Sequence, residues 1–352
     1  MILDGKNVLV TGGTGSLGRS VIKRMLGGEL GRPKKITVFS RDEAKQHYMR
    51  LSYMNRPKDT DDAIYRNSRD LETLEFVIGD VRKYESLVRV VKDAHVVIHA
   101  AALKQVPSAE YFPSEAIDTN IQGALNVVRA VHDYGHDVGI VIGISTDKAC
   151  KPINVMGMTK AVMERVFIEA NLRPGSPKFA CVRYGNVVAS RGSVVPLMLD
   201  QIARGGPVTV TSPDMTRFLL SLDDAVTTVF AALRYADAGE IYVPKLPSVR
   251  IMDLAYSLMG DRDCRIEIIG VRPGEKLHEL LISEEEATRT GERSGHYVIQ
   301  PMLPELIRRN GTLDSVDIGE FSSETVSMKQ HDVSQFIRPF LQTFHEDVEV
   351  LR

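Results

Sequence analysis

A glycine-rich turn near the amino terminus constrains the fold more than any other feature. The run TGGTGSLG (11–18) follows the apolar strand pattern NVLV and opens a helical pattern. In such a strand–turn–helix unit the glycines permit a tight turn, let the backbone approach a pyrophosphate and let the helix pack on the strand, while the helix N-terminus attracts negative charge. We therefore predict a dinucleotide-binding turn, with contacts from Gly12, Thr14, Gly15, Ser16, Leu17 and Gly18.

Short β-branched runs alternate with longer helical patterns through the first half of the chain. This alternation predicts an α/β fold with a Rossmann-type, doubly wound parallel sheet. The predicted strands are 7–11, 36–40, 74–78, 95–100, 139–145 and 179–183, and the predicted helices are 17–26, 84–91, 116–134 and 155–170. We expect a dinucleotide-binding domain over 1–184 and a smaller mixed, mainly substrate-binding region over 185–352, with an approximate boundary and interleaved segments.

Composition limits the possible partners. A net charge of -2 leaves no basic excess for a phosphate backbone, so we expect no nucleic-acid partner. No apolar run approaches the ~20 residues that span a bilayer, and no signal-peptide pattern opens the chain. Three cysteines without CxxC spacing favour reduced thiols, and the histidines lack metal-site spacing. These patterns predict a cytoplasmic protein without membrane contact or bound metal.

The residues after the predicted strands indicate which cofactor binds. Ser40 and Arg41 end the second strand, where an NAD enzyme more often has an acidic residue; a guanidinium there suits a 2′-phosphate, which favours NADP. Asp42, one position later, keeps NAD open. Asp80 and Val81 follow the third strand, where we place the adenine. Small side chains after the fourth strand let the cofactor lie against the backbone; these are Ala100, Ala101 and Ala102.

Several longer motifs carry a family resemblance. They are SRDE (40–43), GDVR (79–82), HAAALKQVPSAEYFP (99–113), TNIQG (119–123), STDKACKPIN (145–154), RYGNVVASRGSVVP (183–196), MTRF (215–218) and RPGEKLHE (272–279), together with the glycine turn. With them the chain resembles the extended short-chain dehydrogenase/reductases and, within these, the inverting UDP-N-acetylglucosamine 4,6-dehydratases. The run NVMGMTK (154–160) looks like the capsule-type branch.

That resemblance implies a reaction and roles for four residues. Hydride leaves C4 of the sugar and later returns to C6; between these steps Lys148 removes the C5 proton, Asp147 protonates the departing C6 hydroxyl, and C5 is inverted. We expect the pKa of Lys148 to be lowered, because a base must be neutral when it acts. Thr146 is expected to bond the C4 hydroxyl and Lys160 the nicotinamide ribose.

Met156 occupies the place of the tyrosine in the Tyr-x-x-x-Lys pair of short-chain dehydrogenases. A thioether does not exchange protons. Either the chemistry rests on Asp147 and Lys148, with the C4 proton leaving through Thr146, water or a ribose relay, or the site is inactive. By itself, Met156 is more typical of core filler. Tyr184 is a conceivable replacement base, but its loop favours packing.

The remaining predicted contacts follow from the same resemblance. Asn120 is assigned to the cofactor. The residues assigned to a UDP-sugar are Lys104, Asn186, Arg191, Val195, Arg217, Arg272 and Glu275. Two alternatives stay open, namely a UDP-sugar 4-epimerase or oxidoreductase, and a non-catalytic NADP-binding regulator. Family members commonly assemble, so we expect a homo-oligomer, either dimer or hexamer. The polar stretch 55–70 is a lid, an oligomer contact or a surface insertion.

Overall fold

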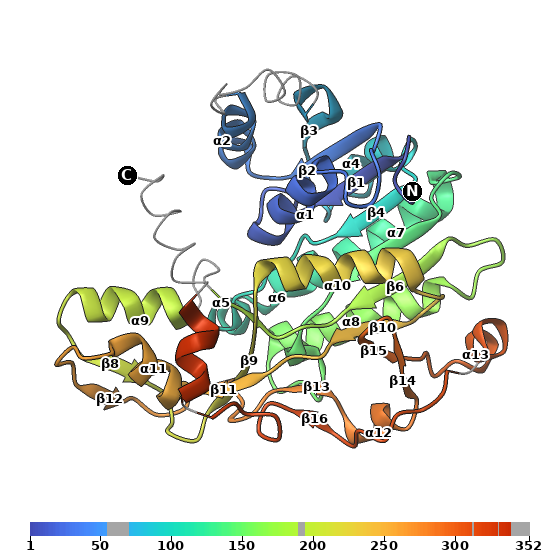
Figure 1. Cartoon of the computed structure of the whole chain (residues 1–352). Helices are drawn as coiled ribbons and strands as arrows, with labels where there is room; N and C mark the ends of the chain where they lie inside the picture. The colour runs from blue at the N-terminus through green and yellow to red at the C-terminus, as the bar shows by residue number, and fades with distance from the viewer. Residues whose placement is uncertain (55–69, 189–193, 312, 330, 339–352) are drawn as a thin grey trace.

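A nine-stranded sheet forms the centre of the molecule (Figure 1). The structure is a computed structural model, and it describes residues 1–54, 70–188, 194–311, 313–329 and 331–338. The sheet order is β14-β15-β10-β6-β5-β4-β1-β2-β3, and the strands from β10 to β3 are parallel. The bounds are β1 Asn7–Thr11, β2 Lys35–Ser40, β3 Leu74–Ile78, β4 Val96–His99, β5 Ile140–Ile144, β6 Lys178–Val182, β10 Ile241–Pro244, β14 Thr290–Arg293 and β15 His296–Ile299. The prediction of a Rossmann-type doubly wound sheet is confirmed.

Helices cover the sheet; of the four that the sequence predicts, those over 84–91 and 155–170 have the predicted bounds, and the one over 17–26 begins one residue earlier. Those of the first half are α1 Ser16–Leu26, α2 Glu43–Met54, α4 Tyr84–Val91, α5 Val106–Tyr111, α6 Pro113–Ala116, α7 Gly123–Tyr134 and α8 Val155–Ala170. The helix predicted over 116–134 is interrupted, because 117–122 form a π-helix, η1 Ile117–Gln122. Inside this wider turn Asn120 is fully buried and bonds to two other segments. The polar stretch 55–70 lies almost entirely outside the described residues.

The second half of the chain returns to the sheet and builds a second core. Strands β10, β14 and β15 extend the sheet beyond β6, so the segments interleave, while the domain boundary near 184 stays a prediction. The smaller strands are β7 Asn186–Val187, β8 Val208–Val210, β9 Thr216–Leu220, β11 Ser248–Arg250, β12 Ile266–Ile268, β13 Leu280–Ile282 and β16 Phe321–Ser322. The helices are α9 Val194–Ala203, α10 Leu222–Tyr235, α11 Ile251–Met259, α12 Glu284–Ala287 and α13 Pro304–Asn310.

The two cores lie in different parts of the molecule. The larger one fills the space between the central sheet and its helices. The smaller one lies among α9, α11 and strands β8, β9 and β11, and Figure 1 shows α9, α11, β8 and β12 gathered at the left. Within the described part of the chain, no helix has the length and apolar character needed to cross a membrane. The carboxyl ends of the parallel strands carry the predicted site residues, as is usual for such sheets.

Candidate active site

The glycine turn between β1 and α1 has the close approaches that the sequence predicts. Gly12 has a φ of +68°, and a Cβ atom there would lie 2.7 Å from the backbone nitrogen of Ala101. A Cβ on Gly18 would lie 2.6 Å from the Cα of Gly13. Helix α1 starts after Gly15 with neither a side-chain cap nor an acidic residue in its first turn. Its first N–H groups therefore suit an anion, and the turn fits a dinucleotide pyrophosphate.

Charged side chains meet where β2 and β3 end. The guanidinium of Arg82 donates to Asp80 Oδ2 at 2.8 Å, and Arg41 Nη1 lies 3.9 Å from the same oxygen. Burial raises the pKa of Asp80, but the bonds from Arg82 outweigh it and the net pKa is lowered. Asp42 Oδ1 instead accepts from the backbone N–H of Lys45 at 2.9 Å, in the first turn of α2. Arg41, whose side chain is half exposed, therefore lies beside Asp80, where the sequence predicts the adenosine end of a dinucleotide.

The predicted Asp-Lys pair lies in a short 3₁₀ turn, η2 Asp147–Ala149, directly after β5. Lys148 Nζ donates to Asp147 Oδ1 at 3.0 Å and lies 3.2 Å from Glu279 Oε1. Thr146 Oγ1 donates to the same Asp147 oxygen at 2.8 Å. The other carboxylate oxygens, Asp147 Oδ2 and Glu279 Oε2, are buried and have no hydrogen-bond partner in the described part of the chain. We call Thr146, Asp147, Lys148 and Glu279 the Lys148 cluster.

The protonation of Lys148 differs from the prediction. Burial lowers the pKa of Lys148, but the carboxylates of Asp147 and Glu279 outweigh it and the net pKa is raised. The expectation of a lowered pKa was wrong, because the carboxylates of Asp147 and Glu279 together outweigh the effect of burial. The ammonium must therefore pass its proton to a neighbour before it acts as a base.

Lys160 lies on α8 and forms no ion pair with any of the described residues. Its Nζ donates to Met163 Sδ at 2.9 Å, and burial lowers the pKa of Lys160 to about 8. Beside it, His99 Nδ1 bonds Thr11 Oγ1 at 2.9 Å, whereas the buried Nε2 lacks a partner among the described residues. Burial, followed by the charge of Lys160, lowers the pKa of His99 to about 3. His99 is consequently neutral near pH 7.

Met156 packs as core. Its side chain is buried in a small apolar cluster with Ala109 and Ala116, bordered by Leu103 and Val106. The thioether is therefore placed among apolar groups, which supports the reading of Met156 as filler. Tyr184 is likewise buried in the main core, and burial raises its pKa.

Two glycines set the approach of neighbouring segments to the Lys148 cluster. A Cβ on Gly157 would lie 2.2 Å from the carbonyl oxygen of Lys148, so α8 reaches this turn only with glycine at that position. Asn154 caps α8 through Gly157 N–H at 2.8 Å and donates from Nδ2 to the Gly274 oxygen at 2.7 Å. Gly274 has a φ of +78°. The segment that carries Glu279 is therefore attached to the start of α8.

Three predicted ligand contacts are instead engaged within the protein. Asn120 accepts from Leu103 N–H at 2.8 Å and donates to Thr159 Oγ1 at 3.0 Å, which ties a loop to α8. Arg217 is buried and donates to the backbone oxygens of 216, 276 and 277. Val195 is buried in the smaller core. These placements favour positioning and packing roles for the three side chains over direct ligand contact, because their polar or apolar surface is already covered.

The other predicted substrate residues keep a capacity for ligands. Asn186 Oδ1 and Glu275 Oε2 are buried oxygens without a partner in the described residues. Arg272 lies near Glu275 at 4.0 Å and is half exposed. Desolvation lowers the pKa of Lys104. Arg191 lies outside the described residues. Among the described residues, no group of three or more His, Cys, Asp or Glu side chains is arranged to hold a metal ion.

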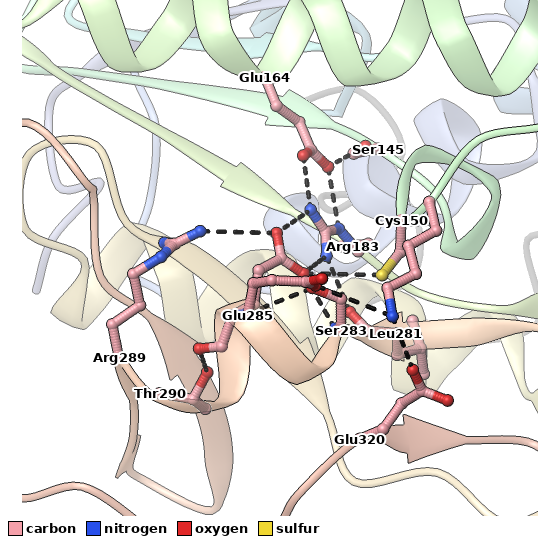
Figure 2. A network of polar contacts seen from close by, with 12 residues as sticks. Ser145, Cys150, Glu164, Arg183, Leu281, Ser283, Glu285, Arg289, Thr290 and Glu320 are labelled. Atoms are coloured by element: carbon pink, nitrogen blue, oxygen red, sulfur yellow. Dashed lines mark hydrogen bonds and ion pairs between the residues drawn. The ribbon is translucent and has the colours of Figure 1, made fainter.

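A second buried charge cluster adjoins the first, and the sequence analysis missed it (Figure 2). Arg183, at the end of β6, donates to both oxygens of Glu164 and both of Glu286, and to the carbonyl of Leu281. Ser145 Oγ also donates to Glu164, at 2.5 Å. Burial raises the pKa of Glu286, but Arg183 outweighs it and lowers this pKa to about 2. We call Ser145, Glu164, Arg183 and Glu286 the Arg183 cluster.

Comparison with known proteins gives the family. Residues 8–301 match the family described as "Polysaccharide biosynthesis protein". The chain belongs to this family. It is 45% identical over 304 residues to a UDP-glucose 4-epimerase of Rickettsia bellii (85% of this chain, 84% of the relative). It is 43% identical over 301 residues to a UDP-N-acetylglucosamine 4,6-dehydratase (inverting) of Campylobacter jejuni (85% and 84%). The family predicted from the motifs is confirmed.

The whole chain also resembles a solved structure. The X-ray structure of Pen from Bacillus thuringiensis shares 31% identity with it at a TM-score of 0.83, covering 96% of this chain and 99% of that one. The likeness therefore includes the carboxy-terminal region as well as the glycine turn. It extends beyond the family match, which ends at residue 301.

Proposed function

We propose that this chain is an NADP-dependent enzyme that dehydrates UDP-N-acetylglucosamine across C5 and C6 and inverts C5. The product would be a UDP-2-acetamido-2,6-dideoxy-4-keto-hexose for a bacterial surface polysaccharide. The observation that carries the proposal is the pair of buried Asp147 and partly buried Lys148 after β5, in which one Asp147 oxygen has no partner among the described residues. The relatives support an enzyme of the sugar-nucleotide dehydratase or epimerase type. The chemistry supplied by a bound dinucleotide is hydride acceptance from C4 and its return to C6.

The proton steps use the Asp147–Lys148 pair. Transfer of one proton from Lys148 to Asp147, along their 3.0 Å hydrogen bond, converts an ammonium and a carboxylate into an amine and a carboxylic acid. Beside a 4-ketone, the amine takes the C5 proton and that electron pair forms the C5–C6 double bond. The C6–oxygen bond breaks, the oxygen takes the Asp147 proton, and water leaves. C6 would then regain the hydride, and C5 would take a proton from solvent on the opposite face, which inverts C5.

An isotope experiment tests this reaction class. A substrate deuterated at C4 should carry its label to C6, with no net formation of NADPH. In heavy water, solvent deuterium should enter C5, and NMR should show the inverted configuration there. Retention of the C6 hydroxyl after prolonged incubation with bound UDP-N-acetylglucosamine rules out this proposal for that substrate.

A 4-epimerase is the second candidate, because the Rickettsia bellii relative carries that name at 45% identity. It would return the C4 label to C4, keep the C6 hydroxyl and leave C5 unlabelled. An oxidoreductase would accumulate reduced cofactor, and a regulator would leave the substrate unchanged. The Asp147–Lys148 pair favours the dehydratase, since epimerisation at C4 needs neither a C5 base nor a C6 acid.

The cofactor choice has its own test. Arg41 is the half-exposed cation next to Asp80, whereas Asp42 is engaged by Lys45. We expect the wild type to prefer NADP over NAD. Arg41→Ala should narrow the preference by about tenfold to a hundredfold, the worth of a charged hydrogen bond. Equal affinity of the wild type for both dinucleotides, measured by titration, contradicts this choice.

A further inference from the structure

Glu279 holds a fixed position beside the Asp147–Lys148 pair. Its backbone N–H donates to Ser323 Oγ at 2.9 Å, and its carbonyl accepts from the Ser323 N–H at 2.9 Å. The next residue, Leu280, begins β13 and pairs with Ser322 of β16. The Glu279 side chain is 2% exposed and its carboxylate lies 3.2 Å from Lys148 Nζ. The backbone anchors on both sides direct this carboxylate at the ammonium.

Other charged side chains lie near Lys148, and they differ in the groups to which they bond. Asp147 faces it from its own turn, Glu279 from the segment before β13, Arg217 from β9 and Lys276 from the same segment as Glu279. Arg217 directs its donors at backbone oxygens, and Lys276 Nζ donates to the Cys150 carbonyl at 2.6 Å. The ammonium of Lys148 therefore lies between two carboxylates, each within ion-pair distance.

We propose that Glu279 is a positioning residue, which holds the Lys148 amine in place and keeps on the Asp147–Lys148 pair the single proton that the elimination uses. This inference rests on the proposed function. Asp147 as acid and Lys148 as base need one proton between them, and the ion pair already contains it. If the pair loses that proton to solvent at high pH, Asp147 has none to give to the leaving C6 oxygen and elimination stops.

The anion of Glu279 delays this loss. A carboxylate beside an ammonium favours the charged form, so it raises the pKa of Lys148, against the opposing effect of burial. It also stabilises the ammonium that forms when Lys148 takes the C5 proton. Removing the charge should therefore lower the pH at which the pair loses its proton. The alkaline limb of the rate profile should move to lower pH.

The experiment measures kcat against pH for the wild type, Glu279→Gln and Glu279→Asp, with formation of the 4-keto-6-deoxy product as readout. In Glu279→Gln the alkaline limb should move down by on the order of one pH unit. Glu279→Asp keeps the charge on a shorter stem, so its limb should move in the same direction by less. Glu285→Gln is the matched control, because Glu285 is an exposed carboxylate of the same segment that bonds Ser283 and lies near Lys151. Its limb should coincide with the wild type.

The outcomes separate three ideas. A graded shift from Asp to Gln supports the inference. A lower kcat with an unmoved limb in both variants overturns it, because a purely structural role reduces the rate at every pH. If Glu279→Gln does not fold, the Glu279→Asp profile decides alone by the same criterion. Failure of the wild type to form a 4-keto-6-deoxy product under any condition instead contradicts the proposed function, and that result precedes every variant.

Discussion

Two buried charge clusters lie side by side in this molecule, and they differ in how fully their polar atoms are used. In the Arg183 cluster, every N–H group of the guanidinium has an acceptor, and both carboxylates receive two bonds from it. In the Lys148 cluster, two carboxylate oxygens are buried without a partner in the described residues. The first arrangement is complete without a ligand. The second has acceptors left for one.

The two clusters share their supporting segments. Ser145 belongs to the Arg183 cluster and the next residue, Thr146, to the Lys148 cluster; Glu279 and Glu286 lie on either side of β13. The saturated cluster therefore fixes the spacing between the end of β5 and the segment that brings Glu279. An unpartnered buried acceptor costs about 1–3 kcal/mol. Its presence beside a firmly bonded neighbour agrees with the substrate site that we propose at the Lys148 cluster.

The largest expected effect comes from breaking the Arg183 cluster. Arg183→Met removes the guanidinium that Glu164 and Glu286 share and leaves Glu286 with the more distant Arg289 at 3.8 Å, which should lower the free energy of unfolding by about 3–5 kcal/mol. Denaturant unfolding followed by circular dichroism measures this. Arg293→Met is the comparison: it breaks the pair of Arg293 with the buried Glu240 elsewhere in the sheet, and its loss in unfolding free energy is measured in the same way. A loss below about 1 kcal/mol for Arg183→Met contradicts a structural role for the cluster.

The Lys148 cluster should respond in the opposite way, with a larger loss of activity than of stability. Lys148→Ala removes the predicted C5 base and should cost on the order of a hundredfold or more in kcat, while dinucleotide binding survives. Its effect on unfolding should be smaller than that of Arg183→Met, because Lys148 holds its two carboxylates through one hydrogen bond and one ion pair, whereas Arg183 holds its two through four hydrogen bonds. Steady-state kinetics and the same unfolding assay compare the variants. Equal stability losses for both would erase the distinction between the clusters.

Sequence reasoning reached the parts of the site that are local in the chain. Strands 7–11 and 74–78 and helices 84–91 and 155–170 have the bounds that apolar periodicity predicts. The turn of Gly12 was found from its strand–turn–helix context, and the Asp147–Lys148 pair was identified through the family resemblance of its motif. The contact of Glu279 with Lys148 was missed because only folding brings these distant segments together. The predicted pKa of Lys148 was wrong because Asp147 and Glu279 together outweigh the effect of burial.

The sequence contains a pattern that could have predicted part of the Arg183 cluster. Arg183 directly follows the apolar run FACV, and Glu164 stands four residues after Lys160 on α8, hence on the same helical face. Opposite charges on buried faces of adjacent elements indicate an internal pair, because an unpaired buried charge is too costly. Glu286 was not predictable in this way, since it enters from a short capped helix that follows β13.

The joint between the clusters provides a weaker test. Gly157→Ala places a Cβ 2.2 Å from the Lys148 carbonyl oxygen, so the turn of η2 or the start of α8 must shift. We expect a stability loss of about 1–3 kcal/mol, typical of overpacking. The activity should fall together with it, because Lys148 moves relative to Glu279. The matched control is Gly139→Ala, directly before β5. A Cβ there would lie 3.9 Å from the nearest backbone oxygen, which is an ordinary contact. Unchanged kcat in Gly157→Ala contradicts the requirement for this close approach.

The smallest expected effect concerns Met156, which belongs to neither cluster. Its thioether packs with Ala109 and Ala116, so Met156→Leu keeps the volume and should cost less than about 1.5 kcal/mol. Because a thioether carries no exchangeable proton, kcat should stay within a few-fold of the wild type. Met158→Leu is the control in the same assays, because Met158 lies two residues further along α8 and is exposed. If Met156→Leu abolished turnover while fold and dinucleotide binding stayed intact, the proton chemistry could not rest on Asp147 and Lys148. The Lys148 cluster would then not be the place where the protons are transferred, whatever the role of its buried carboxylate oxygens.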